Sequence, residues 1–380
     1  MRFRLFSVLF ILTAASLAAP RAEPEDLAAV SSRMQGLVNR HIIAGSVTLV
    51  SQRGKTVHLA ATGSADIAAG RAMRTDDLFW IASMTKPMTA VCVMMLAEQG
   101  KLSVDDPVEK FIPEFRALRL GGRKPPRPVT IRDLLTHTGG LGNAPIAPKA
   151  SLAERTVAYA NAPMRFAPGT RWDYCNGGFN TLGRVIEIVS GKSYAAFLHQ
   201  RLLSPLGMND TTFWPSTRRV AKPYRPGGSR LEETSVYARP GDIGDHSRPA
   251  LAAGGLFSTA SDVARFYQMM LNGGSLGSRR ILSTQSVRQM TAVQTGGIRT
   301  GFVEGMSWGL GFQIVRSPQG ATAALSPGSF GHGGTFATQS WADPRRSAVY
   351  VLMIQRAGYA NPDAAEPRKV FQDAAAAALR

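Results

Sequence analysis

Residues 83–86 read SMTK, and residues 88–97 continue as the apolar run MTAVCVMMLA. A serine hydroxyl and a lysine amine are thus three residues apart, so on a helix Lys86 lies one turn beyond Ser83. Thr89 is the only polar residue in the run that follows, and a helix that is apolar on all sides is buried. The stretch therefore predicts a central helix with a Ser–Lys pair at its start, where burial disfavours a charged lysine and makes it a better base.

The same stretch can be interpreted simply as the start of a helix, with Ser83 as the N-cap and Lys86 as a solvated first-turn residue. Pro87 suits an early position, because its missing N–H removes little hydrogen bonding there. However, a first-turn lysine opposes the helix dipole, and the next turn is apolar throughout. Ser-x-x-Lys is a weak pattern by itself, but Lys86 is the only lysine in the chain with a serine three positions upstream. We therefore favour the catalytic interpretation.

The N-terminus has the pattern of a secretory signal. Arg2 and Arg4 precede an apolar stretch over residues 5–17, and small residues suitable for cleavage follow. The stretch is too short to span a bilayer comfortably, and no later run is long enough for a transmembrane helix. A retained membrane anchor is the alternative interpretation. We expect a signal peptide at residues 1–22, export to the periplasm or the medium, and no stable membrane span after cleavage.

The chain has two cysteines, Cys92 and Cys175. An exported protein permits a disulfide between them, although a domain of this size does not need one. Two separate buried thiols are the favoured interpretation, and the disulfide is the alternative.

The formal net charge is +18, but the basic residues are scattered along the chain. The densest cluster, residues 116–132, is broken by paired glycines and paired prolines and is typical of a solvated loop. A basic surface can attract anionic walls, lipids or nucleic acid. Because aromatic and basic residues are not interleaved, we expect no nucleic-acid partner.

Hydrophobic periodicity predicts strands near both ends of the chain and helices between them. A strand–turn–strand unit is expected over residues 46–61, with its turn at 52–55. Further strands are expected at 308–315, 335–342 and 347–355. In addition to the helix at Ser83, helices are expected at 25–42, 178–190, 194–203, 261–272 and 363–379.

This order of elements predicts an α+β fold. We expect one antiparallel β-sheet, built from both termini and flanked by helices, with a mostly helical inserted domain. The expected sheet domain comprises residues 23–100 and 255–380, and the helical domain comprises residues 101–254. The active site is expected between the two domains.

Tyr-x-Asn is a second candidate motif, and it occurs three times, at residues 159–161, 174–176 and 359–361. Context separates the copies. Tyr174 follows the loop sequence PGTRW and precedes two glycines, in a tight loop that leads into the expected helix at 178–190. A rigidly held polar pair is best placed there, so Tyr174 and Asn176 are the site candidates.

His-x-Gly is a third candidate motif, at residues 137–139 and 332–334. The second copy is expected to open a strand, where glycines let a substrate approach the strand edge and its N–H groups. We take His332 as a site candidate and His137 as a structural loop histidine.

Markers of several other enzyme classes are missing from the sequence. It has no Gly-x-Ser-x-Gly elbow of the α/β-hydrolases. It also has no His-Glu-x-x-His, no closely spaced cysteine pair, and no phosphate-loop or dinucleotide fingerprint. We therefore expect no metal and no cofactor.

Taken in order, Ser83-x-x-Lys86, Tyr174-x-Asn176 and His332-x-Gly334 resemble the motifs of the serine β-lactamase and penicillin-binding-protein superfamily. The likeness is closest to its class C-like branch, which holds class C β-lactamases, D-alanyl-D-alanine carboxypeptidases and family VIII carboxylesterases. It covers nearly all of the mature chain and implies a β-lactamase/transpeptidase-like fold. Other segments that fit are residues 134–141, 205–208, 254–259 and 331–334.

The resemblance implies that Ser83 forms an acyl-enzyme, with Lys86 and Tyr174 as its proton-transfer partners. Water would then release the acyl group. Lysine and tyrosine have reference pKa values of about 10, and when packed together they can share a proton so that one is a base near neutral pH. The oxyanion hole would be formed by the backbone N–H groups of Ser83 and Thr335. The residues implied around the substrate and the oxyanion are Asn176, His332, Gly333, Gly334 and Thr335.

One residue departs from the family pattern, because His332 stands where β-lactamases of this branch usually have a lysine. That lysine gives a fixed positive charge for a substrate carboxylate, whereas a histidine is mostly neutral at pH 7 unless its environment raises its pKa. The change weakens the case for a dedicated β-lactamase and suits an esterase. Some carboxypeptidases of the family also have histidine there.

We therefore expect a carboxylesterase acting on short acyl esters. The alternative is a D-alanyl-D-alanine carboxypeptidase or a weak class C-like β-lactamase that uses the same residues. A third hypothesis is a non-catalytic relative that binds peptidoglycan. The expected partner is a small-molecule ester or amide substrate, with a cell-wall peptide as the alternative.

Overall fold

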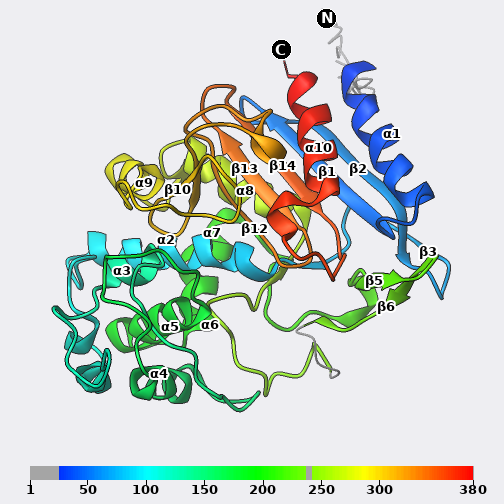
Figure 1. The fold of residues 1–380 in the computed structure, drawn as a ribbon. Helices are drawn as coiled ribbons and strands as arrows, with labels where there is room; N and C mark the ends of the chain where they lie inside the picture. Colours follow the sequence, from blue (N-terminus) through cyan, green and yellow to red (C-terminus); the bar gives the residue numbers. More distant parts are fainter. Residues whose placement is uncertain (1–24, 237–241, 380) are drawn as a thin grey trace, which may run out of the picture.

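The fold is built around one large antiparallel β-sheet. The computed structural model describes residues 25–236 and 242–379, and Figure 1 shows their arrangement. Eight strands pair in the order β10-β11-β12-β13-β14-β1-β2-β3, and neighbouring strands are antiparallel. Their bounds are β1 (Gly45–Gln52), β2 (Lys55–Asp66), β3 (Arg71–Ala72), β10 (Met306–Trp308), β11 (Gln313–Val315), β12 (Phe330–Gly333), β13 (Gln339–Asp343) and β14 (Ala348–Met353).

The two ends of the chain meet in the middle of this sheet. β1 pairs with β14 in a register that sets Val47 opposite Met353 and Leu49 opposite Val351. Successive side chains of a strand point to opposite faces, so Val47 and Leu49 enter one hydrophobic core and Val50 enters another. The predicted α+β fold, with an antiparallel sheet built from both termini, is confirmed.

Helices cover both faces of the sheet (Figure 1). α1 (Glu25–Asn39) and α10 (Glu366–Ala377) pack against each other and share the core that contains Val50. α8 (Ala260–Leu271) contacts β1, β13 and β14 and belongs to the core on the opposite face. The sheet is therefore the middle layer of three, and its strands β1, β12, β13 and β14 are buried on both sides, whereas β2 and β3 are partly exposed.

α2 (Thr85–Glu98) lies between the sheet and the helices built from residues 131–198, as Figure 1 shows. Residues 85–96 of this helix are all buried, which confirms the predicted central helix. α2 contacts β12 and also α5 (Asn176–Ser190) and α6 (Tyr194–Leu198). Side chains at its start are thus placed where the sheet and the helical region meet. The domain bounds at residues 100 and 255 remain a prediction.

The remaining elements are short. The helices are α3 (Ile131–Leu135), α4 (Leu152–Asn161), α7 (Ser204–Leu206) and α9 (Thr284–Thr291). The strands form three two-stranded pairs: β4 (Phe79–Trp80) with β7 (Phe257–Ser258), β5 (Tyr224–Gly227) with β6 (Arg230–Glu233), and β8 (Ser275–Leu276) with β9 (Arg279–Arg280). The β5–β6 hairpin lies in a region that the sequence analysis assigned to loops and helices, so that assignment was incomplete.

Two strand predictions were wrong in their bounds. Residues 308–315 form β10 and β11 rather than one strand, because a turn separates them in which Gly311 has a φ of 82°. The strand expected at 335–342 begins only at Gln339, because residues 334–338 form a turn. His332 therefore lies within β12 instead of opening the next strand.

Within the described ranges, no helix is both long and apolar enough to cross a membrane. The predicted signal peptide, residues 1–22, lies outside the described residues. Cys92 is buried, Cys175 is partly exposed, and both are free thiols. The favoured interpretation of two separate thiols is confirmed, except that Cys175 is not fully buried.

Candidate active site

Ser83 and Lys86 meet at the start of α2. Ser83 lies in the short 3₁₀ helix Ala82–Met84 and is partly exposed, whereas Lys86 lies in the first turn of α2 and is 0% exposed. The Lys86 Nζ is 3.1 Å from the Ser83 Oγ, within hydrogen-bond distance. Ala82, just before the serine, has a φ of 45°, a left-handed conformation that costs a non-glycine residue about 1–3 kcal/mol. The surrounding structure holds this strained backbone where it presents the serine.

The Lys86 amine has two further partners, and neither is a carboxylate. It donates hydrogen bonds to the Asn176 Oδ1 at 2.8 Å and to the Ala253 carbonyl at 2.6 Å. Burial lowers the pKa of Lys86 well below its usual value. A neutral amine fits these contacts, because it can donate to the two acceptors and accept a hydrogen bond from the Ser83 hydroxyl. The site therefore holds a lysine that is able to take the serine proton.

Tyr174 lies on the loop before α5, beside the same amine. The Lys86 Nζ is 4.6 Å from the centre of the Tyr174 ring. Burial raises the pKa of the Tyr174 phenol, and its interaction with Ser83 offsets part of that rise. The phenol hydroxyl nevertheless makes no hydrogen bond of good geometry within the described residues. It is thus a protonated, unengaged group next to the serine.

His137 supports the loop that carries Tyr174. Its ring lies 4.4 Å from the Tyr174 ring, centre to centre, and its Nδ1 accepts a hydrogen bond from the Cys175 N–H at 3.1 Å. Burial lowers the pKa of His137 well below its usual value, so the ring is neutral. These contacts agree with the expected structural role of His137.

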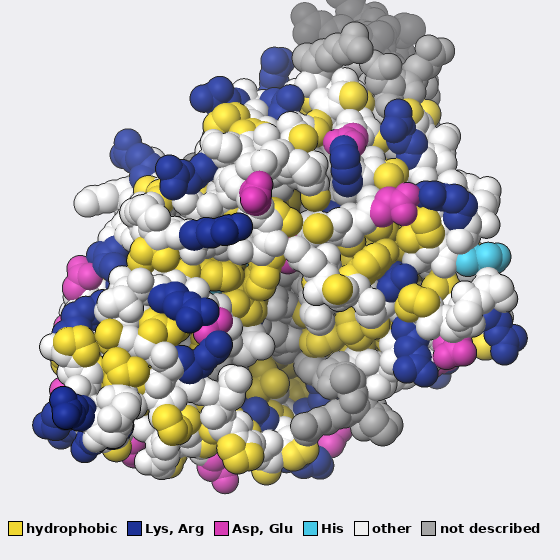
Figure 2. All heavy atoms as spheres, viewed as in Figure 1, with side chains coloured by type: hydrophobic (Ala, Val, Ile, Leu, Met, Phe, Trp, Pro, Cys, Tyr) yellow, Lys and Arg dark blue, Asp and Glu magenta, His cyan; other side chains and the backbone are white. Residues whose placement is uncertain are grey.

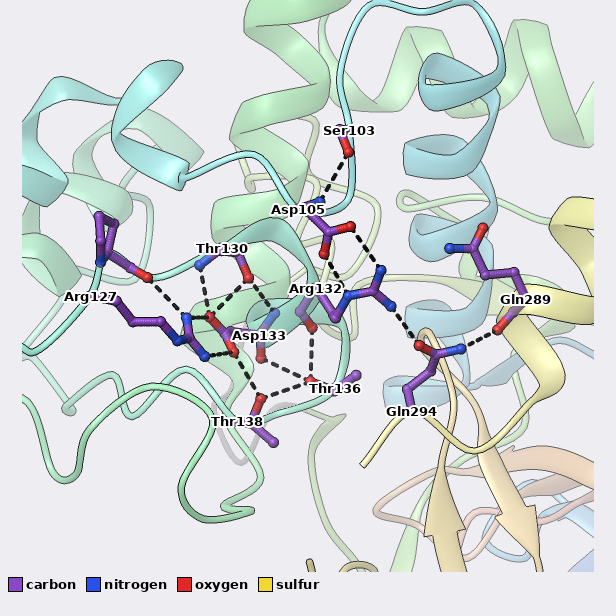
Figure 3. Close-up of polar contacts among 11 residues, drawn as sticks. Ser103, Asp105, Arg127, Thr130, Arg132, Asp133, Thr136, Thr138, Gln289 and Gln294 are labelled. Atoms are coloured by element: carbon purple, nitrogen blue, oxygen red, sulfur yellow. Dashed lines mark hydrogen bonds and ion pairs between the residues drawn. The ribbon is translucent and has the colours of Figure 1, made fainter. Parts of the chain in front are cut away.

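A polar network holds Thr136 and Thr138, the residues on either side of His137 (Figure 3). Asp133 in α3 is 4% exposed and accepts two hydrogen bonds from Arg127, at 2.6 and 2.9 Å. It also accepts hydrogen bonds from Thr130 and from the Thr138 hydroxyl, the latter at 3.2 Å. Because Thr138 follows His137, this buried carboxylate fixes the loop behind the Tyr174 ring.

The opposite wall of the site is the turn at residues 334–338, between β12 and β13. The Gly334 N–H donates to the Thr338 carbonyl at 2.8 Å. Arg368 in α10 is buried and donates to the carbonyls of Gly334 at 2.8 Å and Thr338 at 2.6 Å. The guanidinium also forms an ion pair with Asp363 at 2.9 Å. Arg368 thus fixes the turn that carries Thr335.

Gly333 and Gly334 are required by this close packing. A Cβ atom on Gly333 would lie 2.4 Å from the Arg368 guanidinium. A Cβ atom on Gly334 would lie 2.2 Å from the Thr338 hydroxyl and 2.7 Å from the Ile81 carbonyl. Both glycines therefore let the turn approach Arg368 and the segment that precedes Ser83.

His332 is buried behind this wall. It is 1% exposed, its Nδ1 lies 2.8 Å from the Gly333 carbonyl, and its ring packs against Trp308 and Tyr174. Burial, followed by the nearby Lys86, lowers the pKa of His332 to about 3. The side chain is therefore uncharged at neutral pH, and it is not among the residues that line the cavity beside Ser83.

Ser83 opens into a cavity of about 470 Å³. The space-filling view shows this face of the molecule hollowed between the sheet region and the helical region (Figure 2). Of the predicted site residues, Ser83, Asn176 and Thr335 line the cavity, while Lys86 and Tyr174 lie beside Ser83 without lining it. The remaining lining residues are Trp80, Ala82, Arg155, Tyr159, Asn180, Leu251, Ala253, Gly254 and Phe336.

Part of this wall was not predicted from the sequence. Tyr159, set aside as a second copy of the tyrosine motif, lines the cavity, and its hydroxyl accepts a hydrogen bond from Asn180 at 3.2 Å. Arg155 lies one helical turn before it in α4. An arginine and a tyrosine four residues apart on a helix share one face, which is the only local signal that could have suggested them.

Known proteins resemble this chain over most of its length. Esterase EstB from Burkholderia gladioli is 30% identical, over 92% of this chain and 95% of its own. The D-alanyl-D-alanine-carboxypeptidase/endopeptidase AmpH from Escherichia coli is 28% identical, over 70% of this chain and 69% of its own.

Solved structures share the fold. EstCE1, a hydrolase with promiscuous acyltransferase activity, superimposes with a TM-score of 0.79 at 23% identity, over 92% of this chain and 98% of its own. The sequence model of the Beta-lactamase family matches residues 30–375. The chain, with its three motifs in their expected order, therefore belongs to the Beta-lactamase family.

Proposed function

We propose that the protein is a serine hydrolase that forms an acyl-enzyme on Ser83. The observation that carries this proposal is the buried Lys86 amine, 3.1 Å from the Ser83 Oγ and without a carboxylate partner among the described residues. A lysine whose pKa is lowered by burial is a base near neutral pH. Membership of the Beta-lactamase family, which holds serine hydrolases, supports an enzyme.

The pKa shifts divide the proton-transfer roles between Lys86 and Tyr174. Burial makes Lys86 easier to deprotonate and Tyr174 harder to deprotonate. We therefore assign Lys86 as the base that receives the Ser83 proton while Oγ bonds to the substrate carbonyl carbon. Tyr174 is the neutral donor that passes a proton to the leaving alkoxide as the C–O bond breaks. Lys86 then returns the proton it received to the Tyr174 phenolate, so that both groups regain their starting forms before water reacts.

The second half of the reaction reverses these transfers with water. The same base takes a proton from water, the hydroxide bonds to the acyl carbon, and Ser83 Oγ leaves with a proton. The backbone N–H groups of Ser83 and Thr335 are the proposed donors to the oxyanion, at the mouth of the cavity that both residues line.

We further propose that the preferred substrate is an ester. The walls formed by Trp80, Leu251 and Phe336 are apolar and suit a short acyl group or alcohol. The uncharged His332 offers no fixed positive charge where β-lactamases of this branch usually have one. EstB, which is named an esterase, is similar over nearly the whole chain. AmpH, which is named a carboxypeptidase/endopeptidase, makes peptide hydrolysis the second candidate.

The test compares 4-nitrophenyl butyrate hydrolysis by the wild type, Ser83→Ala and Ser32→Ala. Ser32 is exposed on α1, so its variant should behave like the wild type. Ser83→Ala should lose nearly all turnover, and equal turnover by all three proteins would exclude Ser83 as the nucleophile. A chromogenic cephalosporin and a D-Ala-D-Ala peptide are measured alongside. A peptide kcat/KM well above that of the ester would reject the esterase assignment in favour of the peptidase.

Export of the protein remains a proposal based on residues 1–22. N-terminal sequencing of protein recovered from the periplasm or the medium should find residues 1 to about 22 removed. Recovery of the intact N-terminus in the cytoplasm alone would contradict it.

A further inference from the structure

Arg155 is a buried cation on the wall of the catalytic cavity. It lies in α4, is 9% exposed, and lines the cavity together with Ser83. The other described residues of the lining are apolar or neutral and polar, so Arg155 alone brings a permanent charge to the wall. Lys86, nearby, is driven toward its neutral form by burial.

The protein gives Arg155 carbonyl partners but no ion pair within the described residues, and the neighbouring Glu154 acts on it only through a longer-range charge interaction. Its Nε donates to the Ala150 carbonyl at 2.9 Å, and its Nη2 donates to the carbonyls of Pro148 at 2.8 Å and Ala147 at 3.3 Å. Its Nη1 makes no hydrogen bond to any described residue. No carboxylate of a described residue lies within ion-pair distance of the guanidinium. Three carbonyls thus fix the side chain while leaving one nitrogen for another acceptor.

Acidic groups close to Arg155 in the chain are already engaged. Glu154 accepts hydrogen bonds from the Ser151 N–H at 2.7 Å and the Ser151 hydroxyl at 2.8 Å, so it caps its own helix. Asp173, on the loop before α5, forms an ion pair with Arg165. The segment 237–241, which the structure does not describe, contains no Asp or Glu.

A buried charge without a counterion is destabilising, and native proteins normally pair such groups. Arg155 also belongs to the wall of the cavity into which Ser83 opens. Its planar N–H groups match the geometry of a carboxylate better than that of a neutral ester. A bound anion would form the ion pair that Arg155 lacks.

We infer that Arg155 binds a carboxylate of the substrate, so that the preferred ester carries an anionic group in addition to the bond that is cleaved. This inference rests on the proposed esterase function and narrows its substrate class. The anionic group can belong to the acyl half, as in a half-ester of a dicarboxylic acid, or to the alcohol half, as in an ester of a hydroxy acid. His332, on the sheet side of the site, is uncharged, so Arg155 of α4 would provide the positive charge for the substrate carboxylate.

Two pairs of matched esters test the inference. The first pair is 4-nitrophenyl hydrogen adipate and its methyl ester, which differ in the charge on the acyl half. The second pair is the butyrate esters of 4-hydroxybenzoate and of methyl 4-hydroxybenzoate, which differ on the alcohol half. After uncatalysed hydrolysis is subtracted, the wild type should prefer the charged member of one pair about tenfold or more in kcat/KM, as expected for a charge-assisted hydrogen bond. The pair that shows the preference identifies the half that Arg155 binds.

Arg155→Gln should reduce that preference to about one, because it removes the charge. Arg155→Lys should keep part of it, because it keeps the charge without the planar fork. Arg184→Gln is the matched control, since Arg184 lies on α5, pairs with Glu187 and is absent from the cavity lining, and it should behave like the wild type. A preference that is unchanged in both Arg155 variants would overturn the inference.

A binding measurement separates this inference from the proposed function. Thermal unfolding first shows that the single variant Ser83→Ala and the double variant Ser83→Ala with Arg155→Gln are both folded. The affinity of each variant for adipate is then measured by isothermal titration calorimetry. Adipate should bind the first variant at least tenfold more tightly than the second. Equal affinity would overturn the anion site, even if esters are hydrolysed. Loss of affinity in the second variant would support the site, even if esters prove not to be the substrates.

Discussion

Replacing Arg368 with methionine should detach α10 from the turn at residues 334–338 and lower stability. The Arg368 side chain is 2% exposed, and the Asp363 side chain with which it forms an ion pair is 12% exposed. Methionine keeps much of the length but leaves Asp363 without its cationic partner and removes the hydrogen bonds to three turn carbonyls, those of Gly334, Ala337 and Thr338. Breaking a buried ion pair in this way costs about 3–5 kcal/mol. At roughly 2 °C per kcal/mol for a chain of this size, Tm should fall by roughly 6–10 °C.

The same variant should lose turnover, because Thr335 follows Gly334 in the turn. A shifted Thr335 N–H weakens the proposed contact with the oxyanion, which forms only during reaction. We therefore expect kcat for 4-nitrophenyl butyrate to fall about tenfold or more, with KM nearly unchanged. Thermal unfolding followed by circular dichroism gives the change in stability, and steady-state kinetics below the new Tm gives the change in turnover.

Two further variants make the Arg368 experiment decisive. Arg40→Met removes an exposed ion pair between Arg40, just after α1, and Glu366 of α10, and should change stability by less than about 1 kcal/mol. Adding Asp363→Asn to Arg368→Met removes the unpaired carboxylate, so stability should recover in part while kcat stays low. A lower Tm with wild-type kcat would refute the link between Arg368 and the turn. A wild-type Tm would refute the energetic argument.

Further predictions concern single groups at the site. Because the active form of Lys86 is the neutral amine, kcat/KM should rise with pH through the lowered pKa of Lys86 and level off well below pH 10.5; a pH–rate profile that still rises near pH 10 would contradict this. Tyr174→Phe should lower kcat by about 10²–10³ but barely change Tm, since the phenol hydroxyl has no partner among the described residues; unchanged kcat would remove it from the proton path. Gly333→Ala should unfold at a lower temperature than the wild type, because the added Cβ would lie 2.4 Å from the Arg368 guanidinium. The control Gly36→Ala, which adds a Cβ in open space on α1, should be neutral or stabilising by up to about 1 kcal/mol. Equal Tm values for the two variants would contradict this packing explanation.

Local sequence patterns predicted the elements that depend on neighbours along the chain. The turn between β1 and β2 has Arg53 at a φ of 50° and Gly54 at 77°, as a two-residue hairpin requires. α5 ends at Gly191, which has a φ of 69°. The break between β10 and β11 could not be predicted in this way. There the Gly311 N–H donates to the Leu135 carbonyl in α3, a contact between distant segments that leaves no periodic signal.

The residues of the site could also be predicted only where they form a local sequence motif. The spacing within the Ser83 motif and its order relative to Tyr174 were sufficient to predict groups that the fold brings together. Arg155 and Arg368 were missed because each is held by backbone carbonyls, Arg155 by those of residues just before its helix and Arg368 by those of the distant turn at 334–338. Every residue has a backbone carbonyl, so the sequence does not indicate which carbonyls will bind an arginine side chain. The neutral state of His332 also depends on burial among side chains from other strands, which the motif alone does not specify.

Because β1 hydrogen-bonds to β14, the centre of the sheet cannot close until nearly the whole chain has left the ribosome. At synthesis rates of about 5–20 residues per second, the N-terminal strands wait for many seconds with an open edge. Pairing between such distant strands is also slow once both are available. A chain that folds late stays unfolded for longer. The proposed export through residues 1–22 requires such an unfolded chain, because only an unfolded chain passes through a narrow translocation channel. A truncation before β14 should leave aggregation-prone strands rather than a smaller enzyme.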